Sequence, residues 1–440
     1  MSIRKFERKA VAVPSSRLSR LAKLGGLATS IAGAVAAEGA RRLARGERPR
    51  LEDLLLTPAN AMRAADELAR MRGAAMKVGQ MISMDAGDML PPELAQIFDR
   101  LRAEAHHMPW PQLKRVLAQA WGAGWRDRFE TFDIHPVAAA SIGQVHRART
   151  RDGRDLAIKV QYPGVRRSIN SDVDNVASLM RVAGLVPAGT SIAPMLAEAK
   201  RQLHEEADYE REGRRLAQFG ALLADRPEFR VPDLYPDLTT PSVLAMSYVE
   251  GGPVETLAAA PQAERNRAMT LLIGLLFREL FEFRLMQTDP NFANYRYAPE
   301  TAQVILLDFG ATRAFADAFV DRYRRLLRAG LEGDRAGVRA AALEIGILSG
   351  GAPARMERAL IEMFEMSLEP LRQDTPVDFG ASDLAMRMRD AGMARAEDRA
   401  HFRIPPMDTL LLQRKFGGVY MLATRLRARV DLRALIEPHL

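Results

Sequence analysis

The chain has 440 residues, of which 48% are hydrophobic, so it can bury a large core and disorder is not expected. Lys and Arg outnumber Asp and Glu by 63 to 55, and the net charge of +8 suits an anionic partner such as a nucleotide, a nucleic acid or a membrane surface. The chain contains no cysteine, which excludes disulfides, thiolate metal sites and a cysteine nucleophile, and its seven histidines lack the paired spacing of a zinc site.

Residues 1–50 form a basic N-terminal segment without the compact apolar stretch and cleavage site of a secretory signal. The most apolar part, Gly25 to Ala37, is shorter than the about 20 residues that a membrane-spanning helix needs. The C-terminus also lacks an apolar run of that length. We therefore expect no transmembrane helix and a cytoplasmic location, with peripheral contact to the inner membrane through this segment. A transit peptide and an amphipathic core helix are the alternatives that these residues leave open.

Residues 51–125 are predicted to form a helical extension. Thr57 suits an N-cap with Pro58 at the first helical position, and apolar residues recur at spacings of three and four from Leu68 to Val78.

Residues 126–250 change to short apolar segments around a tight turn, a pattern typical of a small antiparallel sheet. A strongly charged helix is predicted from Pro194 to Ala224, and two short strands follow at Val231–Leu234 and Val243–Val249. The break at Glu250 to Pro253 indicates a hinge.

Residues 251–440 are predicted to be almost entirely helical, interrupted by a loop and hairpin from Thr288 to Phe309. This order of elements predicts an α+β, protein-kinase-like fold with two lobes. The N-lobe has a small antiparallel sheet, the C-lobe is helical, and the helical extension precedes both.

The strongest chemical signal lies in this loop. Asp289 and Asn294 stand five residues apart, and Asp308 follows an apolar run and begins an Asp-Phe-Gly sequence. Phosphoryl transfer from Mg·ATP needs an oxygen acceptor near the attacking group and two side chains that bind magnesium. We predict that Asp289 is catalytic and that Asn294 and Asp308 bind metal. The alternative, a loop whose Asp and Asn only cap turns, is disfavoured because both kinase motifs occur in this order.

Lys159 lies in an apolar strand, where a buried cation is costly unless anions pair with it. Phosphate groups and a helix carboxylate would provide that pairing. A lone strand lysine is more often a solvated edge residue, but this one follows a small-residue loop by one hairpin, which favours phosphate binding. The candidate carboxylates lie on the helix from Leu203 to Glu212, and spacing alone does not choose among them.

The small-residue loop stands where a kinase has its phosphate-covering glycines. It comprises Ala138, Ala139, Ala140 and Ser141. Alanine has a Cβ and a restricted φ range, so we expect a different nucleotide geometry from that of a glycine loop. Replacing Ala140 with glycine is expected to alter nucleotide affinity and to permit self-phosphorylation. The alternative interpretation is a tight packing segment.

Together these motifs resemble the UbiB family of atypical kinase-like ATPases (AarF/UbiB type), and within it the coenzyme Q biosynthesis branch. The resemblance runs from about Leu18 to Phe315. It implies a Lys-x-Gly-Gln motif that covers the place where a protein substrate would bind, and an E-x-D motif in contact with it. The regulatory residues so implied are Lys77, Gly79, Gln80, Glu206 and Asp208.

The resemblance also implies that Glu212 pairs with Lys159, which places both among the catalytic residues beside Asp289. It implies an adenine-binding hinge at Met246, Ser247, Tyr248 and Val249. Gln287 replaces the histidine that many bacterial relatives have before the catalytic aspartate, as in the coenzyme Q branch. The hydrophobic C-terminal anchor of the bacterial namesake has no counterpart in this sequence.

The predicted function is that of a Mg-dependent, ATP-binding kinase-like ATPase that supports ubiquinone biosynthesis at a membrane surface, with ATP and Mg²⁺ as cofactors. Expected partners are an anionic lipid or an isoprenoid or quinone intermediate, and ubiquinone-biosynthesis proteins. No specific nucleic acid is expected, since no basic motif is interleaved with aromatic residues. Two alternatives are a small-molecule or lipid kinase and a nucleotide-gated scaffold for biosynthetic enzymes. The phosphoryl acceptor and the oligomeric state are not specified by the sequence.

Overall fold

The computed structural model describes residues 29, 33, 35–45, 107–182, 193–348, 350–351, 353–396 and 405–440. The chain divides into two compact units. The first takes the described residues up to Arg214 together with Asp233–Tyr248, and the second takes Arg215–Pro232 with Val249–Leu440. The Lys-x-Gly-Gln motif and most of the predicted helical extension, residues 51–106, lie outside the described residues.

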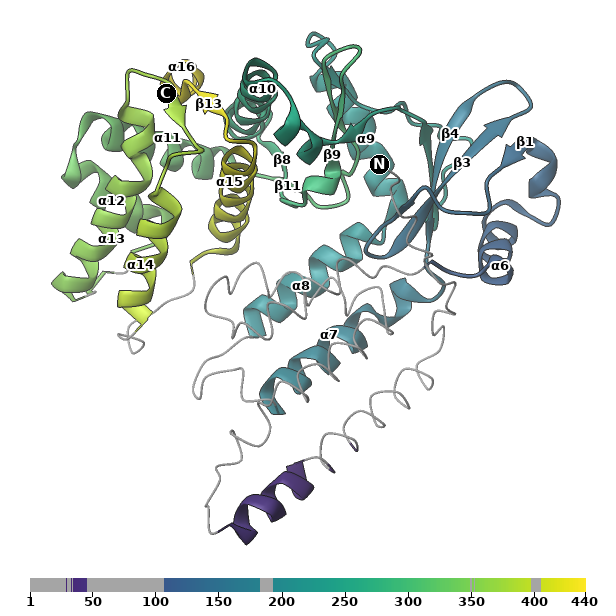
Figure 1. Ribbon diagram of the computed structural model, residues 1–440, viewed down its shortest axis with the longest axis horizontal. Helices are drawn as coiled ribbons and strands as arrows, with labels where there is room; N and C mark the ends of the chain where they lie inside the picture. The colour runs from purple at the N-terminus through teal and green to yellow at the C-terminus, as the bar shows by residue number, and fades with distance from the viewer. Residues whose placement is uncertain are drawn as a thin grey trace. The chain divides into compact units, whose positions relative to one another are not determined.

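The first unit is built on an antiparallel sheet, which within the described residues has five strands in the order β1-β3-β4-β6, with β2 paired to β3 (Figure 1). Its strands are β1 Phe129–Phe132, β2 Ala138–Ala139, β3 Gly143–Thr150, β4 Asp155–Gln161 and β6 Val243–Ser247. Gly153, at φ 93°, makes the turn between β3 and β4 because glycine tolerates the left-handed conformation. The antiparallel sheet expected from the sequence is confirmed.

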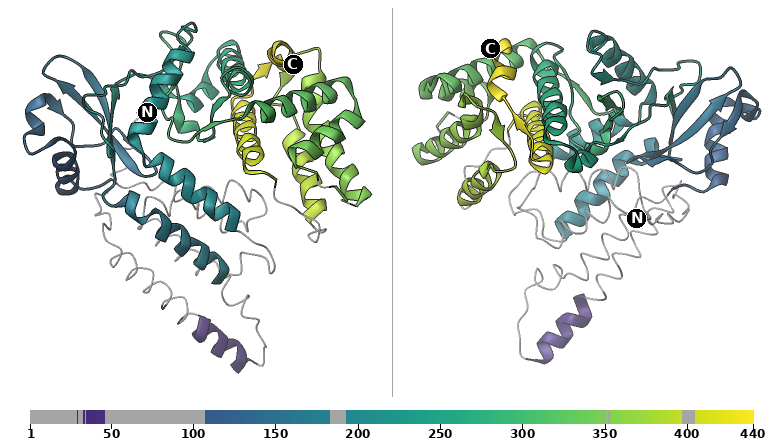
Figure 2. Two further views of the ribbon diagram at one scale, coloured as in Figure 1. Left: turned by 180° about the vertical axis from the view of Figure 1, so that it is seen from behind. Right: turned by 45° about the horizontal axis from the view of Figure 1, so that its top comes forward.

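Helices cover this sheet and extend from it. Helix α6, Trp110–Trp121, packs on β4, and the 3-10 helix η2, Trp125–Arg128, follows it. The Trp125 ring lies 5.1 Å from that of Phe132, centroid to centroid, in a buried aromatic core. Two further helices, α7 Val165–Val182 and α8 Ala193–Glu206, run side by side (Figures 1 and 2).

The helix predicted from Pro194 to Ala224 is in fact two helices, α8 and α9, the latter running from Tyr209 to Leu222. Asp208 caps α9, because its Oδ1 accepts a hydrogen bond from the backbone N–H of Arg211 at 3.0 Å. The Gln161 side chain of β4 donates to the carbonyl of Ala207 at 3.0 Å. The local cap at Asp208 and the long-range bond from Gln161 explain a break that helical periodicity did not reveal.

The second unit contains three small sheets within its described residues, ordered β5-β10-β9-β7, β11-β8 and β12-β13. Its strands are β5 Phe229–Arg230, β7 Gly252–Pro253, β8 Leu285–Gln287, β9 Tyr295–Ala298, β10 Gln303–Leu306, β11 Thr312–Ala314, β12 Val377–Asp378 and β13 Arg429–Val430. The predicted strand at Val231–Leu234 is wrong, because Pro232 has no N–H for a ladder; β5 lies just before it and pairs with β10 in parallel. The expectation of a single hairpin beyond residue 251 was also too simple.

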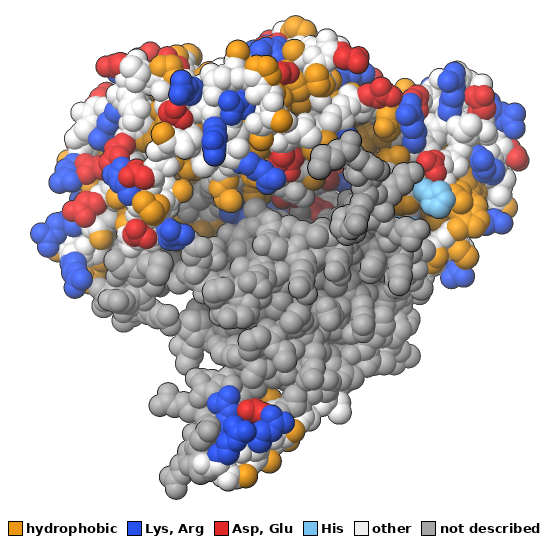
Figure 3. Space-filling model, viewed as in Figure 1, with side chains coloured by type: hydrophobic (Ala, Val, Ile, Leu, Met, Phe, Trp, Pro, Cys, Tyr) orange, Lys and Arg blue, Asp and Glu red, His pale blue; other side chains and the backbone are white. Residues whose placement is uncertain are grey.

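Helices dominate the second unit (Figure 2). They are α10 Gln262–Phe281, α11 Asp317–Glu332, α12 Arg335–Ile345, α13 Ala354–Leu368, α14 Leu384–Ala396, α15 Met407–Leu426 and α16 Leu432–Ile436, with the 3-10 helices η3 Val254–Ala259, η4 Phe292–Asn294, η5 Glu369–Arg372 and η7 Glu437–His439. Among the described helices, none is long and apolar enough to cross a membrane. On the face shown in Figure 3, acidic and basic side chains are interspersed over most of the described surface, while basic side chains predominate on the helix within residues 35–45.

Candidate functional site

A buried ion pair joins the sheet of the first unit to helix α9. The ammonium of Lys159, in β4, lies 2.7 Å from Oε1 of Glu212, and the two residues are only 6% and 1% exposed. The Lys159 ammonium also lies 5.2 Å from the centre of the Tyr209 ring. Among the carboxylates that spacing left open, Glu212 therefore faces Lys159. Its role toward a nucleotide stays a prediction.

The predicted E-x-D residues lie at the junction of α8 and α9. Glu206 is the last residue of α8 and is buried, and Asp208 caps α9, the helix that carries Glu212. Asp208 therefore stabilises the start of α9, one turn before Glu212. The predicted contact of these residues with Lys77, Gly79 and Gln80 lies outside the described residues.

The alanine-rich segment is partly a strand. Ala138 and Ala139 form β2 and pair with β3, and the N–H of Ala140 donates to the carbonyl of Gly143 at 2.9 Å, which closes a turn over the half-buried Ser141. A Cβ at Gly143 would lie 2.5 Å from the Val160 carbonyl oxygen, so only glycine fits there. The backbone of Ala138 and Ala139 is thus hydrogen-bonded in the sheet, and the backbone of Ala140 is held in a tight turn.

A buried polar network, which we did not predict, begins on β3, the strand that pairs with this segment. The Gln144 side chain accepts from the Met108 N–H at 2.7 Å and lies 2.8 Å from Nε2 of His146, whose Nδ1 lies 2.8 Å from the carbonyl of Asp133. Burial lowers the pKa of His146 to about 4, although the bond to Asp133 opposes this shift. The imidazole is neutral at pH 7, so Nδ1 donates and Nε2 accepts. Nothing in an alternating strand sequence distinguishes these two residues from solvent-facing ones.

The predicted adenine-binding hinge forms the end of β6 and the exit from the first unit. Met246 and Ser247 are the last two residues of β6, and the N–H of Tyr248 donates to the carbonyl of Asp155 at 2.9 Å. Val249 is the first residue of the second unit's longer segment. The sheet therefore fixes the backbone at Met246, Ser247 and Tyr248, up to the unit boundary.

The catalytic-loop and Asp-Phe-Gly residues lie together in the second unit. Two strand pairings, β8 with β11 and β9 with β10, hold the two segments side by side. The N–H of Leu307 donates to the carbonyl of Asn294 at 3.0 Å, and the N–H of Thr288 donates to that of Ala311 at 2.8 Å. The structure thus brings together the backbones that carry Asp289, Asn294 and Asp308.

Local bonds orient the three side chains. Oδ1 of Asp289 accepts from the Asn291 N–H at 3.3 Å, and Oδ1 of Asp308 accepts from the Gly310 N–H at 3.0 Å. The Asn294 side-chain nitrogen donates to the Asp289 carbonyl at 3.5 Å, so its amide oxygen is the atom suited to a metal.

The donors of Asn294 and Asp308 fit magnesium, which prefers hard oxygen ligands and usually takes some of them from phosphates. Within the described part of the chain, no cluster of three or more His, Asp or Glu residues could hold a metal ion by itself. The donor set is therefore better suited to a metal that arrives with a nucleotide than to a resident ion.

A second buried network, also missed from the sequence, lies under the catalytic loop. The ammonium of Lys415, in α15, donates to the Tyr295 hydroxyl at 2.6 Å and to Oε1 of Gln287 at 3.0 Å, and it lies 3.5 Å from Glu279 of α10. The N–H of Gln287 in turn donates to Glu279 at 3.3 Å. Because Gln287 and Tyr295 flank residues 288–294, this network fastens both ends of the catalytic loop to two helices.

The network keeps Lys415 charged. Burial lowers the pKa of Lys415, but the Glu279 carboxylate and the Tyr295 hydroxyl outweigh it, so the pKa lies above its ordinary value. The available signal was Glu279, a carboxylate that follows Arg278 near the end of the mostly apolar stretch Leu271 to Phe281. Its partner could not be identified, since Lys415 is far away in the sequence.

A sheet unit with a buried Lys–Glu pair and a second unit that joins a catalytic loop to an Asp-Phe-Gly segment define a kinase-like protein. Residues 100–342 match the ABC1 atypical kinase-like domain, and the chain belongs to that family, which confirms the resemblance found from the motifs.

Individual relatives agree with this assignment. The chain is 37% identical to the mitochondrial atypical kinase COQ8 of Saccharomyces cerevisiae, over 98% of this chain and 86% of that protein. It is 38% identical to the mitochondrial atypical kinase COQ8B of Rattus norvegicus, over 99% and 82%. A solved structure of Rv3197 from Mycobacterium tuberculosis in complex with erythromycin has a TM-score of 0.61 and 25% identity, covering 86% of this chain and 96% of that one. The kinase-like fold is thus confirmed.

Proposed function

We propose that this protein is a Mg-dependent, ATP-binding kinase-like ATPase that supports ubiquinone biosynthesis at a membrane surface. The observation that carries the proposal is the bond from the Leu307 N–H to the Asn294 carbonyl, which sets two magnesium-type ligands on adjacent backbones. The biosynthetic role is supported by the names of the COQ8 relatives and by the motif resemblance to the coenzyme Q branch.

Each residue then has a defined task. Mg·ATP, when bound, supplies the phosphoryl group for transfer. The Lys159 ammonium binds phosphate oxygens while Glu212 orients it, and the oxygens of Asp308 and Asn294 hold the metal. The Asp289 carboxylate orients the attacking hydroxyl or water and accepts its proton.

The remaining residues of the proposed site bind the adenine base, cover the phosphates and exclude protein substrates. The hinge Met246, Ser247, Tyr248 and Val249 binds adenine, and the alanine-rich segment covers the phosphates with a stiffer backbone than a glycine loop has. The regulatory residues Lys77, Gly79, Gln80, Glu206 and Asp208 exclude ordinary protein substrates. The protein works in the cytoplasm in peripheral contact with the inner membrane, where an anionic lipid or an isoprenoid or quinone intermediate, and ubiquinone-biosynthesis proteins, are its partners.

The test is ATP turnover by the purified full chain, with and without phosphatidylglycerol vesicles. We expect magnesium-dependent turnover that the vesicles increase, and a loss of about hundredfold in Asp308→Asn because a charged metal ligand is replaced. No turnover under any condition would reject the enzymatic proposal.

A second variant separates the enzyme from a nucleotide-gated scaffold. Asp289→Asn is expected to bind ATP and partner proteins normally but to fail to restore ubiquinone synthesis in cells that lack the protein. Full restoration by Asp289→Asn would favour the scaffold instead.

A further inference from the structure

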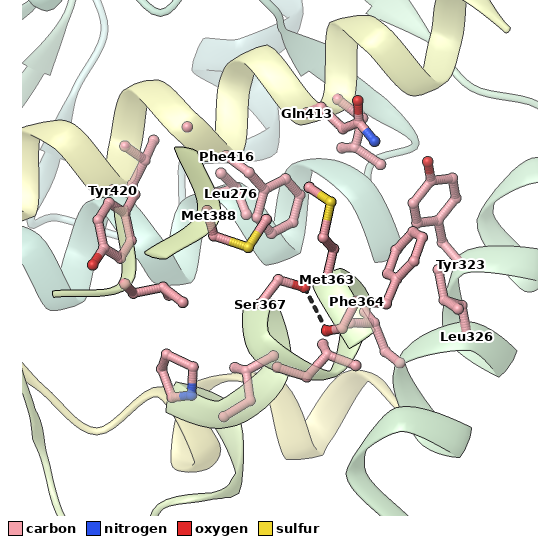
Figure 4. A pocket seen from close by; sticks show the side chains of 18 of the residues that line it. Leu276, Tyr323, Leu326, Met363, Phe364, Ser367, Met388, Gln413, Phe416 and Tyr420 are labelled. Atoms are coloured by element: carbon pink, nitrogen blue, oxygen red, sulfur yellow. Dashed lines mark hydrogen bonds between the residues drawn. The ribbon is translucent and has the colours of Figure 1, made fainter. Parts of the chain in front are cut away.

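The second unit contains an apolar cavity of about 770 Å³ (Figure 4). Small-molecule sites have volumes of about 300–1,000 Å³, so this cavity could hold a ligand rather than a single water. Its walls come from helices α10, α11, α13, α14 and α15. The side chains that Figure 4 shows converging on its centre include Leu276, Met363, Met388 and Phe416.

The lining selects for an uncharged ligand. Among the described residues that line the cavity, none carries a charge, and the polar ones are Tyr323, Ser367, Gln413 and Tyr420. Burial raises the pKa of Tyr323 to about 12, so its phenol is neutral, and the Ser367 hydroxyl donates to the Phe364 carbonyl at 2.7 Å. A charged group inside would be desolvated without a counter-ion, whereas a hydroxyl could bond to these polar groups.

The cavity reaches the surface along one side of α15. Gln413, Gly417 and Met421 follow one another at spacings of four, so they share a helix face, and all three are exposed. Met421 lines the cavity and yet is 64% exposed. An apolar molecule therefore has an entrance that does not require unfolding of the unit.

Helix α15 contacts the catalytic loop as well as the cavity. Phe416 lines the cavity, while its neighbour Lys415 donates to Gln287 and Tyr295 at the two ends of the loop. Gly418 packs so closely on the loop that a Cβ there would clash with Pro290, which follows Asp289.

A third contact links α15 to the chain after Asp-Phe-Gly. Arg313, in β11, donates through Nε to Oδ1 of Asp408, in the first turn of α15, at 2.7 Å. A shift of α15 on filling of the cavity would therefore be felt at both segments that carry the proposed catalytic and metal-binding residues.

We propose that this cavity binds an uncharged amphiphile, an alkyl or isoprenoid chain with a small hydroxyl-bearing head, and that α15 transmits its occupancy to the catalytic loop. The proposal that a ligand binds here depends only on the cavity and its lining. Its regulatory effect rests on the proposed ATP-dependent function. The site differs from a surface that attracts anionic lipid, because none of the described residues that line it is a cation able to pair with a phosphate.

The binding test uses farnesol as probe and the purified full chain in equilibrium dialysis without nucleotide. We expect saturable binding, weakened about tenfold or more in Met388→Trp, whose ring fills the cavity. The matched control is Met386→Trp on the same helix, because Met386 is 51% exposed, and its affinity should equal that of the wild type. Met363→Trp provides a second filled cavity should Met388→Trp not fold. Equal binding by the filled and control variants would overturn the site.

Specificity and coupling are tested with two further measurements. Farnesyl phosphate should bind at least about tenfold more weakly than farnesol, because its charge would enter an uncharged lining; equal affinity would overturn the proposed ligand class. Farnesol should change amide hydrogen exchange across residues 285–295 in the wild type but not in Met388→Trp. Exchange unaltered by farnesol would overturn the coupling. Neither measurement needs ATP turnover, so both remain decisive if the enzymatic proposal fails.

Discussion

Among the residues that the structure describes, each unit buries a Lys–Glu pair, and the two pairs are built differently. In the first unit, Lys159 contacts its carboxylate at 2.7 Å. In the second, Lys415 lies 3.5 Å from Glu279 and makes shorter bonds to two neutral groups, those of Tyr295 and Gln287. The first lysine belongs to a strand and pairs with one helix, whereas the second joins two helices to two strands.

The difference shows two ways of keeping a cation inside a protein. A direct charge pair suits the phosphate-binding role that we propose for Lys159, because it holds the ammonium in one place. A lysine that donates hydrogen bonds to several neutral groups instead acts as a fastener, that is, it holds together the elements that carry those groups. The predictions below test whether the first pair serves chemistry and the second serves architecture.

The largest effect is expected from Lys415→Met. Because Glu279 would be left buried without its cation, the free energy of unfolding should fall by about 3–5 kcal/mol, measured by urea unfolding followed by circular dichroism. The double variant Lys415→Met/Glu279→Leu should recover most of this loss, since no unpaired charge remains. Wild-type stability in the single variant would contradict the role of Lys415 as a fastener.

Acid should lower the free energy of unfolding of the first unit, because this unit buries His146 as a neutral ring. Its pKa is about 4 in the folded protein and about 6.5 when unfolded, so the stability that the neutral ring provides is complete above pH 6.5 and is lost as the pH falls toward 4. The total loss is about 3 kcal/mol. All three tryptophans of the chain lie at positions 110–125, so their fluorescence reports urea unfolding of the first unit. His146→Gln should remove this pH dependence.

The pair in the first unit is tested by Glu212→Gln. A hydrogen bond to a charged group contributes about 1.5–3 kcal/mol, so loss of the carboxylate that orients Lys159 should lower ATP turnover about ten- to hundredfold. Glu210→Gln is the control, because Glu210 is exposed on the same helix. Equal turnover of the two variants would show that the ion pair has no part in the chemistry.

Neighbouring glycines in α15 offer the smallest test. Gly417→Ala should raise the free energy of unfolding by about 0.5–1 kcal/mol, because the new Cβ meets open space and glycine is unfavourable inside a helix. Gly418→Ala should lower it by about 1 kcal/mol and should reduce ATP turnover, since its Cβ meets Pro290. Urea unfolding and a turnover assay check both, and similar behaviour of the two variants would contradict the close packing of α15 on the loop.

The sequence predicted those features of the site and the fold that depend on residues close together in the chain. Asp289, Asn294 and Asp308 follow local motifs, and the fold class follows from the order of helical and strand patterns. Selecting Glu212 required the family resemblance, because several glutamates share that charged helix. Long-range contacts were missed: the break at Ala207 depends on Gln161, and the role of Lys415 depends on residues more than a hundred positions earlier. Strands of two or three residues, such as those of β8 and β11, are too short to show a period.

Because residues 215–232 belong to the second unit although the first resumes after them, the chain passes between the units more than once. Neither unit is therefore a contiguous stretch of translated chain. During synthesis the first unit has all its strands once Tyr248 leaves the ribosome, while β5 must wait for β10 before it can pair. The nascent second unit stays incomplete until β13 and α16 emerge, so chaperone contact during translation is expected to concentrate on the helical half of the molecule.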